Sequence, residues 1–236
     1  MSVWTELAQA SLPGGDLLTL RRRGREFEIR LNLYELMSSR NPASERALAR
    51  LARDRIETAG PRILIGGLGL GYTARAVLDE FGQDARIVVA ELVDEVIAWN
   101  RGEVGEAADR PLDDPRLEVF AGDVAQLLLA RPASFDAILM DVDNGPEAVM
   151  FPGNRALYTP AGLRLMLSGL RPGGLLALWA AEPSPEFEAV LAEIGGGDRA
   201  SVPVSGAAGP VEHFIYLVRS DRLPGDRLTH MVGHAG

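Results

Sequence analysis

Apolar and polar positions along this chain follow two different periods. From residue 61 onward, apolar runs of strand length alternate with segments in which apolar residues recur at helical spacing. Six strands are predicted at residues 62–66, 86–91, 116–121, 136–142, 175–181 and 213–219. Helices are predicted between most of them, at residues 73–81, 93–100, 124–130, 160–168 and 185–194. Such alternation is typical of an α/β protein with a mostly parallel sheet and helices on both faces.

The first 60 residues follow a different pattern. Residues 16–33 alternate polar and apolar positions on both sides of Gly24, which predicts a β-hairpin. A helix is predicted to begin near Asn41 and to end before Gly60. Residues 101–115 are expected to form an acidic loop, and no strand is predicted in 195–210, which are rich in Gly, Ala and Ser. The chain therefore divides into a hairpin-and-helix appendage (1–60), a Rossmann-like domain (61–220) and a flexible tail (221–236).

Three alternate glycines, Gly67, Gly69 and Gly71, separate the first strand of this domain from the helix that follows. Glycine leaves no side chain between the main chain and a ligand, so the loop predicts a nucleotide-type site. Glu91 ends the next strand, where an acid can accept hydrogen bonds from both ribose hydroxyls of an adenosine-containing ligand. A dinucleotide and S-adenosylmethionine both fit this pattern, and the alternative is a tight turn without a ligand.

Acidic residues follow the third and fourth strands of the domain. Asp123 can accept a hydrogen bond from an adenine amino group while the backbone N–H of Val124 donates to the ring, or it can simply cap the following helix. Asp141 and Asp143 would lie on the same side of an extended chain. Neighbouring carboxylates raise each other's proton affinity, so one can act as a base. A turn with solvated acids is the alternative for this pair.

Composition narrows the function classes. The chain of 236 residues has 33 acidic and 24 basic side chains, a net charge of −9 and no cysteine. The charge disfavours nucleic acid as a partner, and the lack of cysteine excludes disulfides and thiol chemistry. His213 falls in an apolar strand as a core or edge residue, and His230 and His234 lack a convergent acid, so no metal is assigned. Neither a signal peptide nor an apolar span of membrane length is recognised, which predicts a cytoplasmic protein without membrane partners.

From Ile63 to about Tyr158 the sequence resembles the spermidine synthase family of polyamine aminopropyltransferases, within the class I S-adenosylmethionine-dependent methyltransferase fold. The family's glycine loop corresponds to residues 67–75, its ribose-binding Glu to Glu91, and its Asp-Pro-Arg segment to residues 114–116, followed by an adenine-binding Asp at Asp123. The resemblance implies a Rossmann-like fold with a seven-stranded sheet, S-adenosylmethionine or its decarboxylated form as ligand, and a homodimer. The ligand contacts it implies are Gly67, Gly69, Leu70, Gly71, Glu91, Leu92, Asp123, Val124 and Asp141.

Three features depart from the family's pattern. The loop acid that helps to hold the aminopropyl group is Leu70 here. The second Asp of the family's Asp-x-x-Asp-Pro segment, its catalytic base, aligns with Asn144, which cannot act as a base. Of the residues that contact polyamine before and within a helix, only Glu45 remains. Because a polycation needs carboxylates along its channel, these losses weaken polyamine as the predicted substrate.

We therefore predict an S-adenosylmethionine-dependent transferase that moves a methyl group to a small-molecule acceptor. Asp143, or less favourably Asp141, is the expected base, and Tyr158 is expected near the acceptor. Together with Trp99 and Trp179, Tyr158 is a candidate for lining an aromatic pocket. The alternatives are aminopropyl transfer from decarboxylated S-adenosylmethionine to a diamine, an intramolecular reaction of the cofactor, a non-catalytic adenosyl-binding module and, last, a nicotinamide oxidoreductase.

Overall fold

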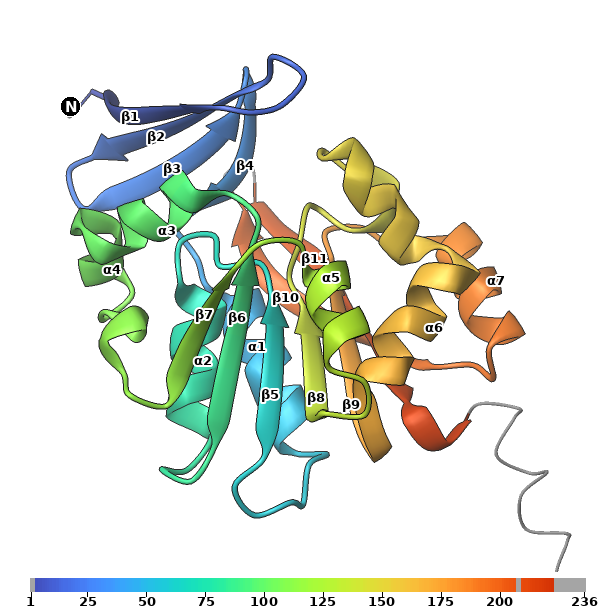
Figure 1. The fold of residues 1–236 in the computed structure, drawn as a ribbon. Coiled ribbons are helices and arrows are strands. Elements are labelled where there is room, and N and C mark those ends of the chain that lie inside the picture. Colours follow the sequence, from blue (N-terminus) through green and yellow to red (C-terminus); the bar gives the residue numbers. More distant parts are fainter. Residues whose placement is uncertain (1–2, 207–208, 223–236) are drawn as a thin grey trace, which may run out of the picture.

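An antiparallel sheet of four strands forms the N-terminal part of the computed structural model, which describes residues 3–206 and 209–222 (Figure 1). Its strands, in spatial order, are β1 (Thr5–Ser11), β2 (Leu17–Arg23), β3 (Glu26–Leu31) and β4 (Tyr34–Ser38). The predicted hairpin is confirmed, because β2 pairs with β3 and Arg23 lies opposite Glu26. The outer strands β1 and β4 were not predicted. They bury few side chains, so their sequences lack a clear apolar alternation.

The second sheet has seven strands in the order β10-β11-β9-β8-β5-β6-β7. They are β5 (Arg62–Gly66), β6 (Arg86–Glu91), β7 (Leu117–Ala121), β8 (Phe135–Met140), β9 (Leu170–Ala180), β10 (Asp198–Gly206) and β11 (Gly209–Arg219). The strands β5 to β9 are parallel, and β11 and β10 add an antiparallel hairpin at one edge. This arrangement confirms the predicted Rossmann-like fold. The unpredicted strand β10 lies at the sheet edge within the small-residue segment, where most side chains are exposed.

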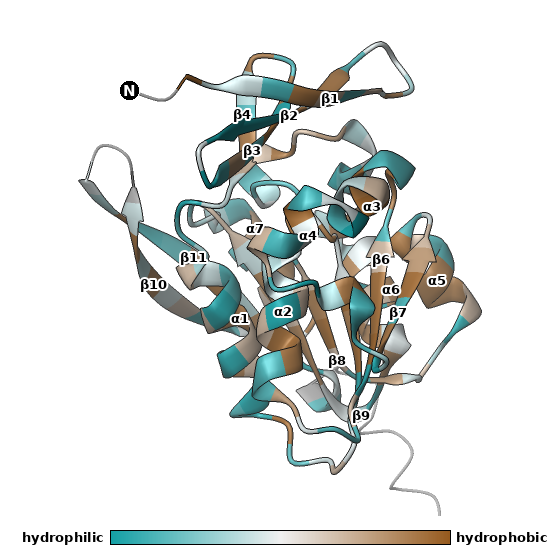
Figure 2. Ribbon diagram, turned by 90° about the vertical axis from the view of Figure 1, so that its left-hand side faces the viewer, coloured by the Kyte–Doolittle hydropathy of each residue, from teal (hydrophilic) through white to brown (hydrophobic). Residues whose placement is uncertain are grey.

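Helices cover both faces of this sheet (Figures 1 and 2). They are α1 (Ala43–Arg53), α2 (Tyr72–Glu80), α3 (Asp94–Arg101), α4 (Glu103–Ala107), α5 (Val124–Ala130), α6 (Pro160–Gly169) and α7 (Pro185–Glu193). One core lies beneath α1, α2 and α3 and the other beneath α5, α6 and α7. The strand β5 serves both, because Ile63 and Ile65 enter the first core and Leu64 the second. The helix α4 corrects the predicted loop at 101–115, since Val104 buries its side chain there.

The expected domain boundary at residue 60 and the expected flexible tail at 221–236 both stay predictions. The helix α1, which precedes this boundary, packs against α2 and the larger sheet. Residues 220–222 form a short 3-10 helix, and the rest of the expected tail lies outside the described residues. Within residues 3–206 and 209–222, no helix has the length and apolar character needed to cross a membrane.

The Asp-Pro-Arg segment anchors β7 to α2. The guanidinium of Arg116 is 7% exposed and donates to both carboxylate oxygens of Asp114, at 3.0 and 2.8 Å. It also donates to the carbonyl oxygens of Leu78, Phe81 and Gly82, at 3.0, 2.8 and 3.2 Å. The guanidinium holds the pKa of Asp114 down at about 2. The segment therefore fixes the loop between α2 and β6 to the start of β7.

Replacing Arg116 with Ala is expected to lower the free energy of unfolding by about 3 kcal/mol, because three carbonyl groups and a carboxylate lose their partner. Urea unfolding followed by circular dichroism measures this loss. Arg131→Ala is the matched control, since the Arg131–Glu118 ion pair is exposed and is expected to contribute less than about 1 kcal/mol. Equal losses in the two variants would contradict the anchoring role.

Candidate active site

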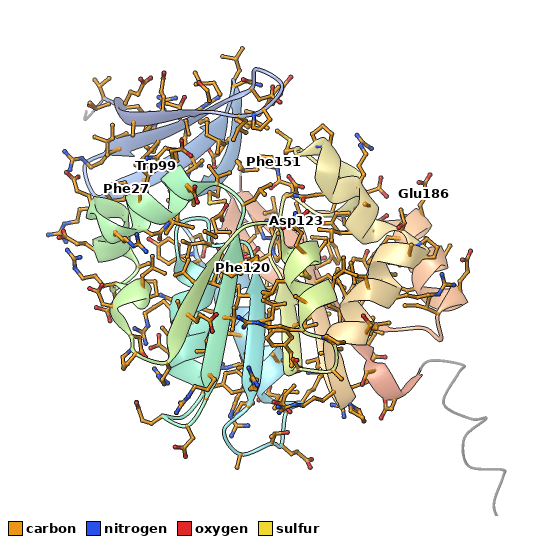
Figure 3. All side chains as sticks on the ribbon, viewed as in Figure 1. Phe27, Trp99, Phe120, Asp123, Phe151 and Glu186 are labelled. Atoms are coloured by element: carbon orange, nitrogen blue, oxygen red, sulfur yellow. The ribbon has the colours of Figure 1, made fainter. Side chains whose placement is uncertain are left out.

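Two cavities lie at the edge of the large sheet where β5, β6 and β8 end, next to β4 of the N-terminal sheet. The larger cavity has a volume of about 480 Å³, within the range of small-molecule sites. The smaller cavity is lined by Glu91 and Asp123, among others. Figure 3 shows Asp123 and Phe151 at this edge, below the N-terminal sheet. The cavities share five lining residues, Leu36, Met37, Gly69, Asp141 and Asp143.

The glycine loop packs closely against β4, α3 and the segment after β8. A Cβ atom on Gly67, which has φ +89°, would lie 2.3 Å from the carbonyl oxygen of Asp141. On Gly71, which has φ +85° and caps α2, it would lie 2.8 Å from Oδ1 of Asn100. L side chains rarely adopt such angles, so both positions require glycine. The loop therefore approaches the residues after β8 more closely than any side chain would permit.

Asn100 is a site residue that the sequence analysis missed. It is 2% exposed, and its Nδ2 donates to the carbonyl oxygens of Gly69 at 2.7 Å and Val96 at 2.9 Å. Its signal in the sequence is a single amide on the apolar face of α3, next to Val96 and Ile97. Buried amides of this kind usually hold a backbone segment in place. Asn100 fixes the middle of the glycine loop to α3.

Glu91 supports the same loop from β6. Its Oε2 accepts from the backbone N–H of Leu68 at 2.9 Å, and its Oε1 accepts from that of Val93 at 2.9 Å. Burial raises the pKa of Glu91, and these hydrogen bonds oppose that rise. The next residue, Leu92, is 58% exposed and lines the smaller cavity. A buried acid beside an exposed apolar side chain forms a surface that suits a ribose and a base.

Asp123 caps α5 and also lines the smaller cavity, so its cap does not exclude the adenine contact, which stays a prediction. Its Oδ1 accepts from the backbone N–H of Ala125 at 2.8 Å. Val124 lines the cavity beside it. Gly67, Gly69, Glu91 and Leu92 line the same cavity, whereas Leu70 lines only the larger one and Gly71 lines neither. The structure thus brings most of the expected ligand contacts together.

Two acids that line the larger cavity, Asp141 and Glu45, interact electrostatically. Asp141, directly after β8, accepts a hydrogen bond from the Thr73 hydroxyl on α2. Glu45, on α1, accepts from the Ser44 hydroxyl at 2.8 Å. Burial and then the charge of Asp141 raise the pKa of Glu45 to about 7, and burial raises the pKa of Asp141. Such a pair can hold a proton near neutral pH and accept or release it.

Asp143, the expected base, is engaged in the loop after β8. Its Oδ1 accepts from the backbone N–H groups of Met150 at 3.1 Å and Phe151 at 3.0 Å, and its Oδ2 accepts from Nδ2 of Asn154 at 2.6 Å. Burial raises the pKa of Asp143, and these three donors act against that rise. The carboxylate therefore holds residues 150–154 beside the smaller cavity while it lines both cavities.

The aromatic residues do not gather in one pocket as expected. Tyr158 lines neither cavity: its hydroxyl donates to the carbonyl oxygen of Val142 at 3.0 Å, and its ring packs against Phe187. Burial raises the pKa of its hydroxyl. Of the three aromatic residues expected in a pocket, Trp179 lines the larger cavity, whereas Trp99 packs against a core. His213 also lines this cavity, and its buried Nδ1 lacks a hydrogen-bond partner among the described residues.

Metal ligands do not converge at this site. Among residues 3–206 and 209–222, no group of three His, Cys, Asp or Glu side chains is arranged to hold a metal ion. His230 and His234 lie outside the described residues. The polar groups at the sheet edge instead suit a nucleoside in one cavity and a polar small molecule in the other.

The fold defines a Rossmann-like protein with two cavities at the carboxyl edge of its parallel strands. No protein family model matches the chain. It is 35% identical over 124 residues to polyamine aminopropyltransferase 2 of Pseudomonas aeruginosa. The matched segment is 51% of this chain and 33% of that protein. It is 31% identical over 137 residues to the polyamine aminopropyltransferase of Nitrosomonas europaea. The matched segment is 56% of this chain and 39% of that protein. The chain thus matches little more than a third of the length of these curated relatives.

Solved structures of spermidine synthases share the fold over nearly the whole chain. One in complex with the transition-state analogue AdoDATO superimposes with a TM-score of 0.73 and 15% identity, over 98% of this chain and 80% of that one. The spermidine synthase of Thermotoga maritima gives a TM-score of 0.71 and 13% identity. This superposition covers 98% of this chain and 80% of that one. The resemblance to the spermidine synthase family, with a class I methyltransferase-like fold, is confirmed.

These comparisons correct the expectation of methyl transfer. Relatives and structural neighbours carry the names of aminopropyltransferases and spermidine synthases, so the alternative reading is better supported and the preference for methyl transfer is wrong. That preference depended on three losses together, at Leu70, at Asn144 and among the residues beside Glu45. Glu45 and Asp141, which the sequence analysis had kept as acids, line the larger cavity. The cavity therefore keeps negative charge although the loop acid is missing.

Replacing Glu91 with Gln is expected to lower the stability of the protein, because the glycine loop loses a support, and to weaken ligand binding in the smaller cavity. Gln offers one oxygen acceptor, so its amide nitrogen would face the N–H of Leu68 or Val93. We expect a loss of about 2 kcal/mol in unfolding free energy and binding of methylthioadenosine weakened at least about tenfold. Urea unfolding and calorimetry measure these effects. The exposed Glu95→Gln variant is the control, and identical behaviour of the two variants would contradict the assignment.

Replacing Glu45 with Gln is expected to change the pH dependence of stability. The pKa of Glu45 is about 7 in the folded protein and 4.5 in the ordinary case, so the folded state binds more protons between these values. Unfolding free energy of the native protein therefore falls as the pH rises from about 4.5 to 7. Because the amide has no charge to bury, the Tm advantage of the variant should grow between pH 5 and pH 8. Parallel Tm curves for the two proteins would contradict this result.

Proposed function

We propose that this chain catalyses transfer of an aminopropyl group from decarboxylated S-adenosylmethionine to a small amine. One observation carries the proposal: the smaller cavity, which Glu91 and Asp123 line, shares Gly69, Asp141 and Asp143 with an acid-lined cavity of about 480 Å³. A nucleoside in the smaller cavity would direct its sulfonium group toward that shared wall. The similarity to polyamine aminopropyltransferases supports the same reaction.

The chemistry requires a free amine nitrogen in line with the bond that breaks. When bound, decarboxylated S-adenosylmethionine supplies a carbon–sulfur bond that breaks as the amine forms a carbon–nitrogen bond, so that methylthioadenosine leaves and the amine nitrogen loses a proton. The acids of the larger cavity attract the amine as an ammonium ion and accept one proton from it, which frees the nitrogen lone pair for the attack. In this proposal Gly67, Gly69, Glu91, Leu92 and Asp123 hold the nucleoside.

Asp141, coupled to Glu45, is our proposed proton acceptor. Asp141 receives one side-chain hydrogen bond, from Thr73, whereas the oxygens of Asp143 accept three hydrogen bonds from the loop at residues 150–154. A carboxylate surrounded by donors is a weaker base, because each donor stabilises its charged form. We therefore assign Asp143 to positioning and the proton transfer to the pair on the larger cavity.

Incubation of the protein with decarboxylated S-adenosylmethionine and a set of small amines is expected to release methylthioadenosine, detected by mass spectrometry. Asp141→Asn should lower kcat at least about 100-fold, because it removes the proton acceptor. The exposed Asp84→Asn variant should retain the native rate. Release without any amine would indicate an intramolecular reaction. No release with any amine, although the sulfonium compound binds, would overturn the proposal.

A further inference from the structure

Thr73, in the first turn of α2, is bonded to the acid that we propose as the proton acceptor. The residue is 2% exposed, and its hydroxyl donates to Oδ2 of Asp141. The backbone N–H of Asp141 donates to the carbonyl oxygen of Gly66, at the end of β5, at 2.9 Å. The main chain and the side chain of Asp141 are therefore both held, one by β5 and the other by α2.

The Thr73 hydroxyl does not take either of the local roles that are open to it. A threonine in a helix can donate to the carbonyl oxygen four residues earlier, and one at the helix start can cap it. The carbonyl oxygen four residues before Thr73 is that of Gly69, which accepts from Nδ2 of Asn100 at 2.7 Å. The N-cap of α2 is Gly71, without a side-chain hydrogen bond. The hydroxyl binds instead to a carboxylate 68 positions away along the chain.

The two oxygens of the Asp141 carboxylate differ in their surroundings. Oδ2 accepts from Thr73. Within residues 3–206 and 209–222, Oδ1 accepts no hydrogen bond, yet it is not fully buried, and Asp141 lines both cavities. Both oxygens of Asp143, by contrast, accept hydrogen bonds from the loop at residues 150–154. Thr73 thus occupies one oxygen of Asp141 and leaves the other open to a ligand.

Acidic groups predominate around the Asp141 carboxylate. The ionisable groups that line the larger cavity or act on Asp141 are Glu45 on α1, Asp143 in the same segment, Tyr158 in η3 (Pro152–Tyr158), Tyr72 in α2, His213 on β11, and the ion pair of Glu35 and Arg40. The guanidinium of this set is already paired with its own carboxylate. Burial raises the pKa of Asp141, and the Thr73 hydroxyl lowers it. Thr73 is therefore the neighbour that favours the charged form of Asp141.

We propose that Thr73 is a positioning residue for the aminopropyl transfer: its hydroxyl holds Oδ2 of Asp141 and leaves Oδ1 free to accept the proton of the amine. This inference rests on the proposed function and adds the group that prepares its base. A carboxylate that was free to rotate would present either oxygen, or neither, to the amine. Without the donor, the buried acid would also keep its own proton up to a higher pH and could not accept one from the amine.

Three substitutions separate the hydroxyl of Thr73 from its size. Thr73→Val keeps the β-branched shape without the hydroxyl, Thr73→Ala lacks both, and Thr73→Ser keeps the hydroxyl without the methyl group. Release of methylthioadenosine at saturating amine gives kcat from about pH 5.5 to about pH 9.5. Both variants without the hydroxyl are expected to move the acid-side midpoint of this profile up by at least about one pH unit. Thr73→Ser should keep the native midpoint.

Size alone would give a different order. If Thr73 only fills space, Thr73→Val should behave like the native protein, and Thr73→Ala and Thr73→Ser should lose activity by the same factor at every pH. That order, or a lower kcat in all variants without a shift of the midpoint, would overturn the inference and leave the aminopropyl transfer intact. No release by the native protein would overturn the proposed function, and the role of Thr73 with it.

Thr159→Val is the matched control. The hydroxyl of Thr159 donates to the carbonyl oxygen of Ala156 at 2.8 Å, and Thr159 lines neither of the two cavities, so this variant should be less stable and keep the native midpoint. A second readout needs no turnover, because the nuclear magnetic resonance signal of the Asp141 carboxyl carbon, assigned with Asp141→Asn, follows its titration directly. Thr73→Val should raise the midpoint of this titration by about one pH unit, and an unchanged midpoint would overturn the inference.

Discussion

The close contact between the glycine loop and the segment after β8 is the constraint on which the rest of the site depends. With a Cβ position on Gly67 only 2.3 Å from the Asp141 carbonyl oxygen, the two segments pack backbone to backbone. Asn100 and Glu91 hold the loop from α3 and β6, and the Thr73 hydroxyl binds the Asp141 side chain. The same contact shapes the smaller cavity and brings a buried acid to its border. The proposed nucleoside binding and proton transfer therefore both depend on this contact.

The N-terminal sheet completes the site by covering the sheet edge. The strand β4 contributes Leu36 and Met37 to both cavities, and Glu45 comes from α1, which follows β4. A Cβ atom on Gly69 would lie 2.7 Å from Sδ of Met37, so this cover rests directly on the glycine loop. The proposed acceptor site thus consists of the carboxyl ends of parallel strands on one side and an antiparallel sheet with its connecting helix on the other. In this setting burial, followed by the charge of Asp141, raises the pKa of Glu45.

The sequence predicted what depends on local pattern and left out what depends on tertiary contacts. Residues 62–66 and 124–130 were predicted with the observed bounds, because a buried run and a capped amphipathic turn are local signals. The edge strands β1, β4 and β10 were missed, since they bury too few side chains to show a period. Asn100 was missed because only the fold shows that its amide meets the carbonyl of Gly69.

The larger cavity keeps negative charge although Leu70 takes the place of the loop acid. Glu45, on α1, and Asp141 and Asp143, after β8, line this cavity. The central claim is that a nucleoside cavity and an amine cavity meet at Asp141. A crystal structure with methylthioadenosine tests it most directly. The account predicts the ribose hydroxyls on Glu91, the base beside Leu92 and Asp123, and the sulfur atom facing Asp141 at the border of the larger cavity. A nucleoside bound elsewhere, or one with its sulfur directed away from Asp141, would contradict the account.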